Sequence, residues 1–552
     1  MQDIEAPRNG GRILVESLVK NGVEAVYCVP GESYLPVLDA LRDEQGVRTV
    51  VTRHEGAASY MADAYGKLTG RPGICFVTRG PGATHASNGV HTAMQDSTPM
   101  ILFIGQVERG FLGREAFQEV DYVRMFGGLA KWATQIDSIE RIPEVVARAF
   151  SVAMSGRPGP VVVALPDDIL FSQGVAGAAV AAQAVQAAPS QADMSELHRL
   201  LSAAQRPLLV VGGSGWSAPA CQALHRFVAA NALPVATAFR RQDLFDNDDP
   251  HYVGHLGFGL SPQLAERVRG ADLILAIGTR LGEVTSNGYT LIASPQPAQT
   301  LIHVHADPEE LGRVYRARLP INAGMQSFAG ALGELPPLDG DAWRQWTQDA
   351  RAEYLAFSTP PATSPEHRGV DMGKVMTHLR EVLPADAIVS NGAGNYAVWV
   401  HRFYRYRRPA TELAPTNGAM GYGLPAAIAA KLEHPERQVV CFAGDGCFMM
   451  YPQELATARQ FGAAVVVIVV NNGMYGTIRM HQEREYPSRP FATDLQNPDF
   501  VALARALGAH AEVVERSEDF PAAFARATEA GRPALIELKV DPRQITPQAR
   551  LP

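Results

Sequence analysis

Short, continuous apolar runs recur along the chain and limit the folds that are open to it. Each run holds four to six residues, with helical stretches between, and the runs cover 73–77, 100–104, 161–165, 208–211, 273–277, 439–442, 465–470 and 534–538. Strands that are apolar without alternation are buried on both faces, which is typical of parallel sheets covered by helices. The sequence therefore predicts an α/β fold with mainly parallel sheets flanked by helices.

Two breaks in this pattern divide the chain of 552 residues. Residues 171–195 are rich in Ala, Gln and Gly without a helical period, and residues 335–367 hold two Pro-rich stretches around a short Trp-containing helix. A Gly-Arg-Pro turn leads into a strand in both 156–168 and 531–542, which hints that the first and last parts are related. A chain of this length is expected to form several domains. We predict three, which cover 1–172, 190–335 and 366–545.

Composition excludes several classes of function. The net charge of −8 gives no electrostatic reason to expect a nucleic acid or an anionic membrane as a partner. The five cysteines form no CxxC pair, which favours a reducing compartment. The first residues carry acids and no apolar segment of a signal peptide, and no run reaches 18 apolar residues. We therefore expect a cytoplasmic globular protein.

The segment AGDGC, residues 443–447, places Asp445 between two glycines directly after the run 439–442. After Gly446 come 24 residues, and then Asn471 and Asn472 end the next apolar run. Ligands of open parallel sheets gather beyond the carboxyl ends of the strands. Carboxylate and amide oxygens suit Mg²⁺, and glycine backbone N–H groups can approach a phosphate. Two unrelated turns are the alternative, but the combination favours a site for Mg²⁺ and a diphosphate.

This segment resembles the signature of thiamine diphosphate-dependent enzymes. Nearly the whole chain resembles the acetolactate synthase-like branch of that family, of the large catalytic subunit type. The resemblance implies a pyrimidine-binding, a central and a diphosphate-binding domain in that order, with thiamine diphosphate and Mg²⁺ as cofactors. It also implies the metal ligands, which are Asp445, Asn472 and the carbonyl of Met474.

Glu55 lies in the first turn of a helix predicted over 53–70, where apolar residues recur at helical spacing. A glutamate there can simply complement the helix dipole. The resemblance implies a catalytic role instead, since the matching glutamate of the family contacts N1′ of the aminopyrimidine ring. That contact stabilises the imino tautomer that takes the C2 proton, and a partly buried carboxyl group would have a raised pKa to suit.

The other cofactor contacts are implied by the same resemblance. The Gly418 carbonyl would accept a bond from the 4′-amine, and Met420 would support the bent cofactor, although a Met among glycines is also a common gap filler. In SNGAGNY, Asn395 and Tyr396 replace the Gln-His of acetolactate synthases. The predicted set is completed by Gly394, Gly444, Gly446, Cys447 and Gly476.

Phe117 and Gln118, in AFQE, and His85, in GPGATHASNGV, are candidate catalytic residues because they match positions around the substrate channel of the branch. His85 stands where the branch usually has Asn, and a packing role is equally open. Lys131 matches the same channel.

Departures from the branch change the expected pocket. The second Arg of the family's RFDDR is Val284, and the Trp that favours 2-oxobutyrate as the acceptor is His481. The Met-His-Gly flavin contact is His255-Leu256-Gly257. Losing a buried Arg or an aromatic wall can change substrate choice.

The resemblance thus implies decarboxylation of a 2-oxo acid, with pyruvate as donor and acetolactate as the default product after carboligation. A 2-oxo acid decarboxylase without carboligation or a 2-hydroxyacyl lyase on the same scaffold is the alternative. A regulatory paralogue that binds the cofactor without catalysis is the alternative from another class, but it would have no need for Glu55.

The same resemblance bears on whether the chain binds flavin and on how it assembles. Residues 210–216, 276–280 and 303–308 resemble FAD-binding elements, but they could also be a relic or bind another nucleotide, so FAD stays open. Because Glu55 and the metal ligands fall in different domains, the resemblance implies a homodimer or tetramer with active sites at the subunit interface. Whether a small regulatory subunit exists stays open as well.

Overall fold

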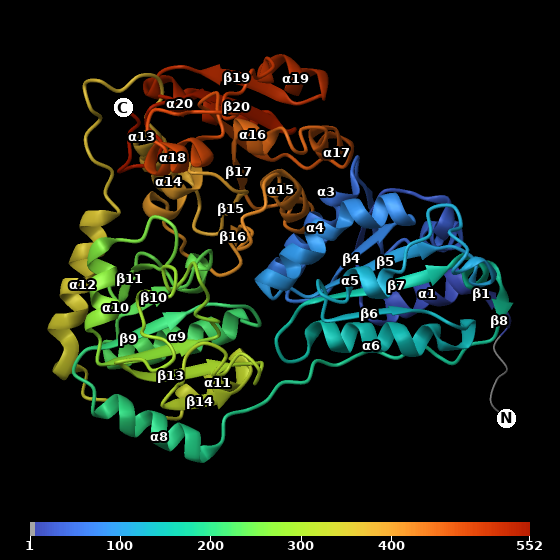
Figure 1. Cartoon of the computed structure of the whole chain (residues 1–552), viewed down its shortest axis with the longest axis horizontal. Coiled ribbons are helices and arrows are strands. Elements are labelled where there is room, and N and C mark those ends of the chain that lie inside the picture. The colour runs from blue at the N-terminus through green and yellow to red at the C-terminus, as the bar shows by residue number, and fades with distance from the viewer. Residues whose placement is uncertain (1–5) are drawn as a thin grey trace. The chain divides into compact units, whose positions relative to one another are not determined.

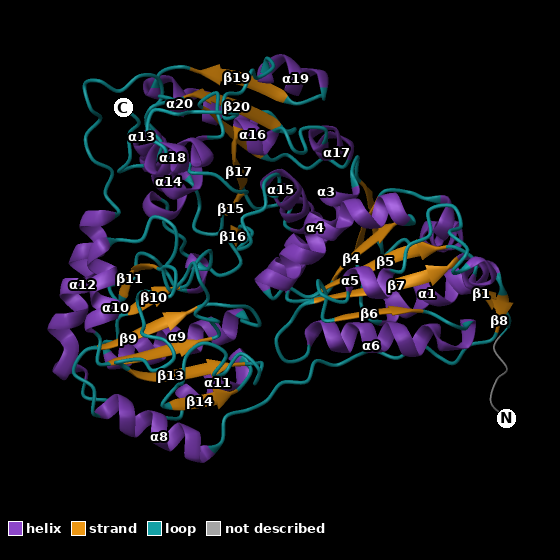
Figure 2. Cartoon of the chain, in the orientation of Figure 1, coloured by secondary structure: helices purple, strands orange, loops and turns teal. Residues whose placement is uncertain are grey.

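The computed structural model describes residues 6–552 (Figure 1). Within this range the chain forms three six-stranded sheets, and every strand pair inside them is parallel. Helices flank each sheet (Figure 2). The predicted α/β class is confirmed, and each of the three sheets lies within one of the three predicted domain ranges. By its internal contacts the chain divides into two units, which are residues 6–185 with 428–433, and the remainder.

The first unit contains the N-terminal sheet, whose strand order is β3-β2-β4-β5-β7-β6. Its strands are β2 (Ala25–Cys28), β3 (Arg48–Val51), β4 (Gly73–Val77), β5 (Met100–Gln106), β6 (Trp132–Gln135) and β7 (Pro160–Pro166). Its helices are α1 (Gly10–Lys20), α2 (Leu35–Asp43), α3 (Glu55–Thr69), α4 (Gly80–Asp96), α5 (Tyr122–Phe126), α6 (Ile142–Met154) and α7 (Asp167–Phe171). A short antiparallel pair joins β1 (Arg8–Asn9) to β8 (Gln173–Gly174).

The central sheet has the order β11-β10-β9-β12-β13-β14. Its strands are β9 (Pro207–Val211), β10 (Val235–Thr237), β11 (Tyr252–His255), β12 (Leu273–Ile277), β13 (Thr300–His305) and β14 (Leu319–Asn322). Its helices are α8 (Gln191–Ser202), α9 (Ala218–Asn231), α10 (Pro262–Gly270), α11 (Met325–Leu332) and α12 (Arg344–Phe357). Counted along the chain this order is 3-2-1-4-5-6, the arrangement of dinucleotide-binding folds.

The C-terminal sheet has the order β16-β15-β17-β18-β20-β19. Its strands are β15 (Ile388–Asn391), β16 (Glu412–Leu413), β17 (Val439–Gly444), β18 (Val466–Asn471), β19 (His510–Val514) and β20 (Ala534–Lys539). Its helices are α13 (Met372–Val382), α14 (Tyr396–Phe403), α15 (Gly423–Glu433), α16 (Asp445–Phe448), α17 (Glu454–Gln460), α18 (Gly476–Glu485), α19 (Phe500–Ala506) and α20 (Phe520–Glu529).

The N-terminal and C-terminal sheets share one topology. Counted along each domain, both strand orders read 2-1-3-4-6-5. The two Gly-Arg-Pro turns lead into β7 and β20, which occupy the same place in the two sheets. The repeated turn in the sequence therefore corresponds to a repeated architecture.

Candidate active site

A cavity of about 420 Å³ lies beyond the carboxyl ends of β15 and β17, because residues that follow both strands line it. The strand order reverses between these two strands, and ligands of open α/β sheets bind at such a point. All twelve residues that the sequence predicts for the cofactor and the metal line this cavity: Gly394, Asn395, Tyr396, Gly418, Met420, Gly444, Asp445, Gly446, Cys447, Asn472, Met474 and Gly476.

Asp445 is the first residue of α16 and is almost wholly buried. Its Oδ1 accepts a hydrogen bond from Gly446 N at 2.9 Å, and its Oδ2 accepts from Gly473 N at 2.9 Å and from Asn497 Nδ2 at 2.8 Å. Burial raises the pKa of Asp445, and these donors act against that rise. The three N–H groups fix the carboxylate at the rim of the cavity.

Asn472 and Met474 lie in the turn after β18. Met474 N donates to Asn472 Oδ1 at 3.2 Å, and Gly476 N donates to the Met474 carbonyl at 2.9 Å. Each acceptor oxygen has a second lone pair. A Cβ on residue 476 would lie 2.8 Å from Asn472 Nδ2, so a larger residue there would displace the Asn472 amide. Carboxylate, amide and carbonyl oxygens thus border one cavity, and this donor set suits a hard cation.

Tyr396 and Cys447 tie the cavity loops together. The Tyr396 hydroxyl accepts from Gly392 N at 3.1 Å and donates to Cys447 Sγ at 3.4 Å. The same sulfur accepts from Gly421 N at 3.2 Å. Since these bonds occupy the polar atoms of both side chains, the two residues contribute the shape of the cavity. Asn395 performs a similar task, as its Oδ1 accepts from the Thr477 hydroxyl at 3.0 Å.

Two residues that the sequence analysis did not identify support the cavity loops without lining the cavity. Asn497 bridges Asp445 and Asn471, to whose Oδ1 it donates at 3.1 Å. Arg240 is a buried residue of the central domain with a left-handed φ of 58°. Its guanidinium donates to the Pro415 carbonyl and, at 2.9 Å, to the Gly392 carbonyl. One side chain therefore holds the loop after β15 and the loop before Gly418.

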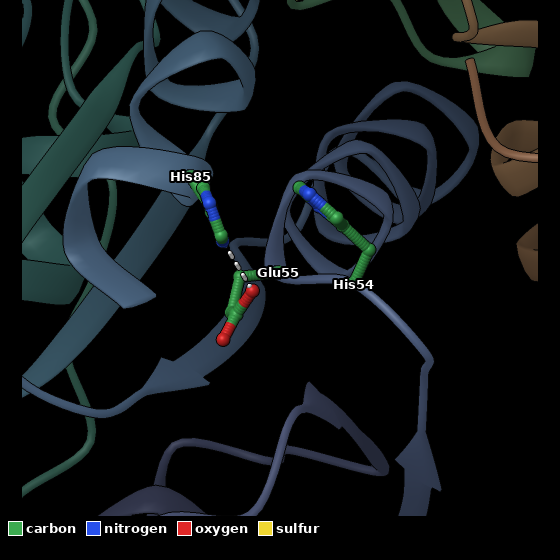
Figure 3. Close-up of side chains that lie close together, drawn as sticks. All are labelled: His54, Glu55 and His85. Carbon is green, nitrogen blue, oxygen red and sulfur yellow. Dashed lines mark hydrogen bonds and ion pairs between the residues drawn. The ribbon is translucent and has the colours of Figure 1, made fainter. Parts of the chain in front are cut away.

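The N-terminal domain presents a second group of functional side chains, shown in Figure 3. Glu55 is the first residue of α3, as predicted, and His54 caps that helix by accepting from Gly56 N through Nδ1 at 2.9 Å. His85, on α4, lies with its Nδ1 2.9 Å from Glu55 Oε2. The rings of His54 and His85 stack with centroids 4.5 Å apart. Burial, and next the His85 charge, lower the pKa of His54, which keeps its Nδ1 an acceptor.

Close helix packing brings His85 to Glu55. A Cβ on Gly89 would lie 2.2 Å from Ser59 Oγ, so α4 approaches α3 as closely as glycine allows. Residues four apart lie on one face of a helix. Glu55 shares its face with Ser59, and His85 shares its face with Gly89, so the glycine contact sets the distance between the two functional side chains.

One metal-ligand atom from each of His54, Glu55 and His85 lies within 4.8 Å of the other two. The stacked rings do not favour a metal, because imidazole lone pairs lie in the ring planes and these planes are inclined by only 29°. The Nδ1 lone pair of His54 is also used in the helix cap. We therefore interpret the cluster as an acid with an imidazole partner.

Comparisons with known proteins identify the family of the chain. Family models of thiamine pyrophosphate enzymes match residues 8–125 (N-terminal TPP binding domain), 194–332 (central domain) and 392–538 (C-terminal TPP binding domain). The chain belongs to the thiamine pyrophosphate enzyme family.

Similar members of the family include acetolactate synthases. The chain is 32% identical over 535 residues to the acetolactate synthase isozyme 2 large subunit of Escherichia coli K12, covering 97% of this chain and 96% of the relative. It is 33% identical over 557 residues to the acetolactate synthase large subunit of Parasynechococcus marenigrum (98% and 89%). It is 31% identical over 558 residues to acetolactate synthase 3, chloroplastic, of Brassica napus (97% and 84%). The resemblance to the acetolactate synthase-like branch is confirmed.

The residues of this family member fit its cofactor. Gly446 lets the Tyr475 ring approach the cavity loop closely, since a Cβ there would lie 2.6 Å from Tyr475 Cε1. The hard oxygen donors suit a metal-bound diphosphate, and Glu55 offers a carboxyl group for a ring nitrogen. Within the described residues, no helix is both long enough and apolar enough to cross a membrane.

Phe117 and Gln118 lie in a loop of the N-terminal domain. The Phe117 side chain is strongly exposed. Gln118 has a left-handed φ of 64°, and its carbonyl accepts from Gly80 N, at the start of α4, at 3.0 Å. The loop is therefore pinned to the helix that carries His85, while the roles of both side chains stay predictions.

Lys131 is used for structure in this protein. Its Nζ donates to the carbonyls of Val152, Ser155 and Arg157 at 2.6, 2.9 and 2.7 Å. These carbonyls belong to the end of α6 and the turn that follows, where a cation satisfies groups that the helix leaves unpaired. Lys131 therefore has a structural role at this helix terminus, and its match to the substrate channel stays a prediction.

The central domain has the strand order expected for a dinucleotide fold, but its own side chains bond to the glycine-rich loop after β9. Trp216 Nε1 donates to the Gly212 carbonyl at 2.9 Å, and Arg241 Nη1 donates to the Gly213 carbonyl at 2.5 Å. A Cβ on Gly213 would lie 2.0 Å from the Gly278 carbonyl, so the loops after β9 and β12 touch. FAD remains a prediction that these contacts do not support.

Proposed function

We propose that this protein uses Mg²⁺ and thiamine diphosphate to decarboxylate pyruvate and to join the acyl fragment to an acceptor, with acetolactate as the product. The observation that carries the proposal is the convergence of all twelve predicted cofactor and metal residues on one cavity. The names of the relatives, large subunits of acetolactate synthase among them, supply the reaction. Near full-length similarity to synthases disfavours a simple decarboxylase, a lyase or a non-catalytic paralogue.

Different residues of the chain would bind the metal, admit the diphosphate and hold a proton. Asp445, Asn472 and the Met474 carbonyl would hold Mg²⁺, and the glycines beside Asp445 would admit the diphosphate. The cofactor supplies an electron sink for decarboxylation. Glu55 would hold a proton at the ring nitrogen, and Gly418 would orient the amine through its carbonyl.

The proposal also covers assembly and location. Glu55 lies in the first unit and the metal ligands in the second, so we propose a homodimer or tetramer whose sites form between subunits, by analogy with the family. The words "large subunit" in the relatives' names make a small regulatory subunit part of the proposal. All five cysteines are free and buried, which supports a reducing, cytoplasmic setting.

The test is turnover by the purified protein with thiamine diphosphate, Mg²⁺ and pyruvate. Pyruvate loss and the product are measured together, and an absorbance spectrum recorded beforehand shows whether flavin is bound. We expect acetolactate, and we expect Glu55→Gln to abolish turnover while the cofactor still binds. If pyruvate is untouched although the cofactor binds, the changes at Val284 and His481 have altered the donor, and this assignment fails.

A further inference from the structure

The two oxygens of Glu55 have different surroundings. Oε2 lies 2.9 Å from His85 Nδ1 (Figure 3). Oε1 has no hydrogen bond to any residue in the described range, and it lies beside Gly82, where an added Cβ would be 3.6 Å away. One oxygen is therefore held by the protein, and the other is left for a ligand.

His85 is also much more exposed than this carboxyl group. The Glu55 side chain is 14% exposed, while the His85 side chain is 52% exposed. The other titratable groups around Glu55 are Tyr34, Cys75 and His54. Burial raises the pKa of Tyr34 and of Cys75, so both stay protonated at neutral pH. The pKa of His54 is lowered, mainly by burial, and its Nδ1 is occupied.

We propose that His85 is a positioning residue for Glu55 that also carries protons between this carboxyl group and solvent. It orients the carboxyl group by binding Oε2, and its side chain is half exposed in the single chain, which gives it access to water. Histidine is suited to this task because an imidazole has two nitrogens that can take up and release a proton near neutral pH. The inference rests on the proposed function, in which Glu55 exchanges a proton with the cofactor.

The proton balance is simple. When Glu55 is protonated, the O–H bond at Oε2 breaks and an N–H bond forms at His85 Nδ1. The N–H bond at His85 Nε2 breaks, and its proton passes to water. One proton has moved from the carboxyl group to solvent, and the reverse sequence protonates Glu55 again. No oxidant or second reactant is required.

The readout is the exchange of the C2 proton of bound thiamine diphosphate for deuterium, followed by quenched-flow NMR without any substrate. We expect His85→Ala to slow this exchange about a hundredfold, the lower end of the range of about 10²- to 10⁴-fold for a positioned acid–base group. The Kd for the cofactor, measured by calorimetry, should change less than about threefold, because the bulk of cofactor binding is expected in the second unit. The matched control is His91→Ala on the same helix, six positions later and so on another face.

Two further measurements separate proton transfer from packing. His85→Asn keeps an amide near the Nδ1 position but cannot carry a proton, so its exchange should also be slow. Free imidazole in the buffer should speed the exchange in His85→Ala and have no such effect in Glu55→Gln. Exchange at the wild-type rate in His85→Asn, or no effect of imidazole on His85→Ala, would overturn the proton-carrying role.

This test can fail independently of the proposed function. If the wild-type protein does not bind thiamine diphosphate, or binds it without C2 exchange, the proposed function fails. If wild-type exchange is fast and the His85 variants match it, the proposed function stands and this inference is wrong.

Discussion

Asn497→Ala is the change that most directly tests the proposed metal site. The amide of Asn497 bonds to Asp445 Oδ2 at 2.8 Å and to Asn471 Oδ1 at 3.1 Å. The variant leaves Asp445 with its two backbone donors, so the carboxylate remains but loses the side chain that orients Oδ2. The expected effect is weaker Mg²⁺ binding with little loss of fold.

The size of this effect follows from the bonds that are lost. A hydrogen bond to a charged group contributes about 1.5–3 kcal/mol. Loss of a partner that orients a metal ligand typically costs about 10- to 100-fold in metal affinity, which corresponds to about 1.4–2.8 kcal/mol. The two estimates agree. We therefore expect the Kd for Mg²⁺ to rise about 10- to 100-fold in Asn497→Ala.

Trp399 lines the same cavity, so its fluorescence provides the assay. Metal-free protein with saturating thiamine diphosphate is titrated with Mg²⁺, and the Kd is read from the fluorescence change. Asn322→Ala is the matched control, because Asn322 Nδ2 donates to the His305 carbonyl at 3.0 Å in the central sheet, away from the cavity. An Asn497→Ala protein that folds normally and binds Mg²⁺ within about twofold of wild type would refute the reasoning.

Three further changes test other parts of the structure. Arg240→Met removes the bonds to two cavity loops and should raise the Kd for the cofactor about tenfold by calorimetry, with kcat kept at saturating cofactor. Lys131→Met should lower the free energy of unfolding in urea by about 1–3 kcal/mol and leave kcat unchanged. Lost turnover at normal stability would instead indicate that Lys131 lines the substrate channel. Burial acts to raise the pKa of Asp249, but hydrogen bonds from His251 and His225 outweigh it and lower the pKa to about 2. This carboxylate thus stabilises the fold above its unfolded pKa of 3.8, and that stability is lost as the pH falls towards 2. Asp249→Asn should therefore lower the free energy of unfolding, measured in urea, by about 1 kcal/mol at pH near 7, allowing for solvent screening. The loss should be smaller at pH near 3.

Much of the fold could be predicted because buried parallel strands are short apolar runs. Each of the eight predicted runs overlaps a strand, and the run at 73–77 has the bounds of β4. The glycines and the acid at 444–446 mark the end of β17 for the same local reason, since a strand end, a turn and a ligand side chain are adjacent in sequence. Short strands such as β16 were missed because two residues carry no pattern.

The residues that support the cavity loops could not be predicted because their contacts join positions far apart in the sequence. Asn497 reaches Asp445 only after the chain folds back, with Leu495 N bonded to the Gly473 carbonyl at 2.9 Å. Arg240 meets its loops across more than 150 residues of chain. Among the residues that support the candidate site, His85 alone had a signal in the sequence, because the chain departs there from the Asn that its branch usually has.

The first and third domains share one topology but differ in the side chains that follow their strands. In the C-terminal sheet the first residues after the third and fourth strands along the domain are Asp445 and Asn472. At the matching places after β4 and β5 the N-terminal sheet has Thr78 and Val107, which offer no carboxylate and no amide oxygen. The first domain therefore lacks the donor set for a metal-bound diphosphate at the place where the third domain has it. Its acid instead follows the second strand, β3, as Glu55. Neither domain carries both the acid and the metal ligands, so catalysis of the proposed kind requires that one domain of each type meet around a single cofactor.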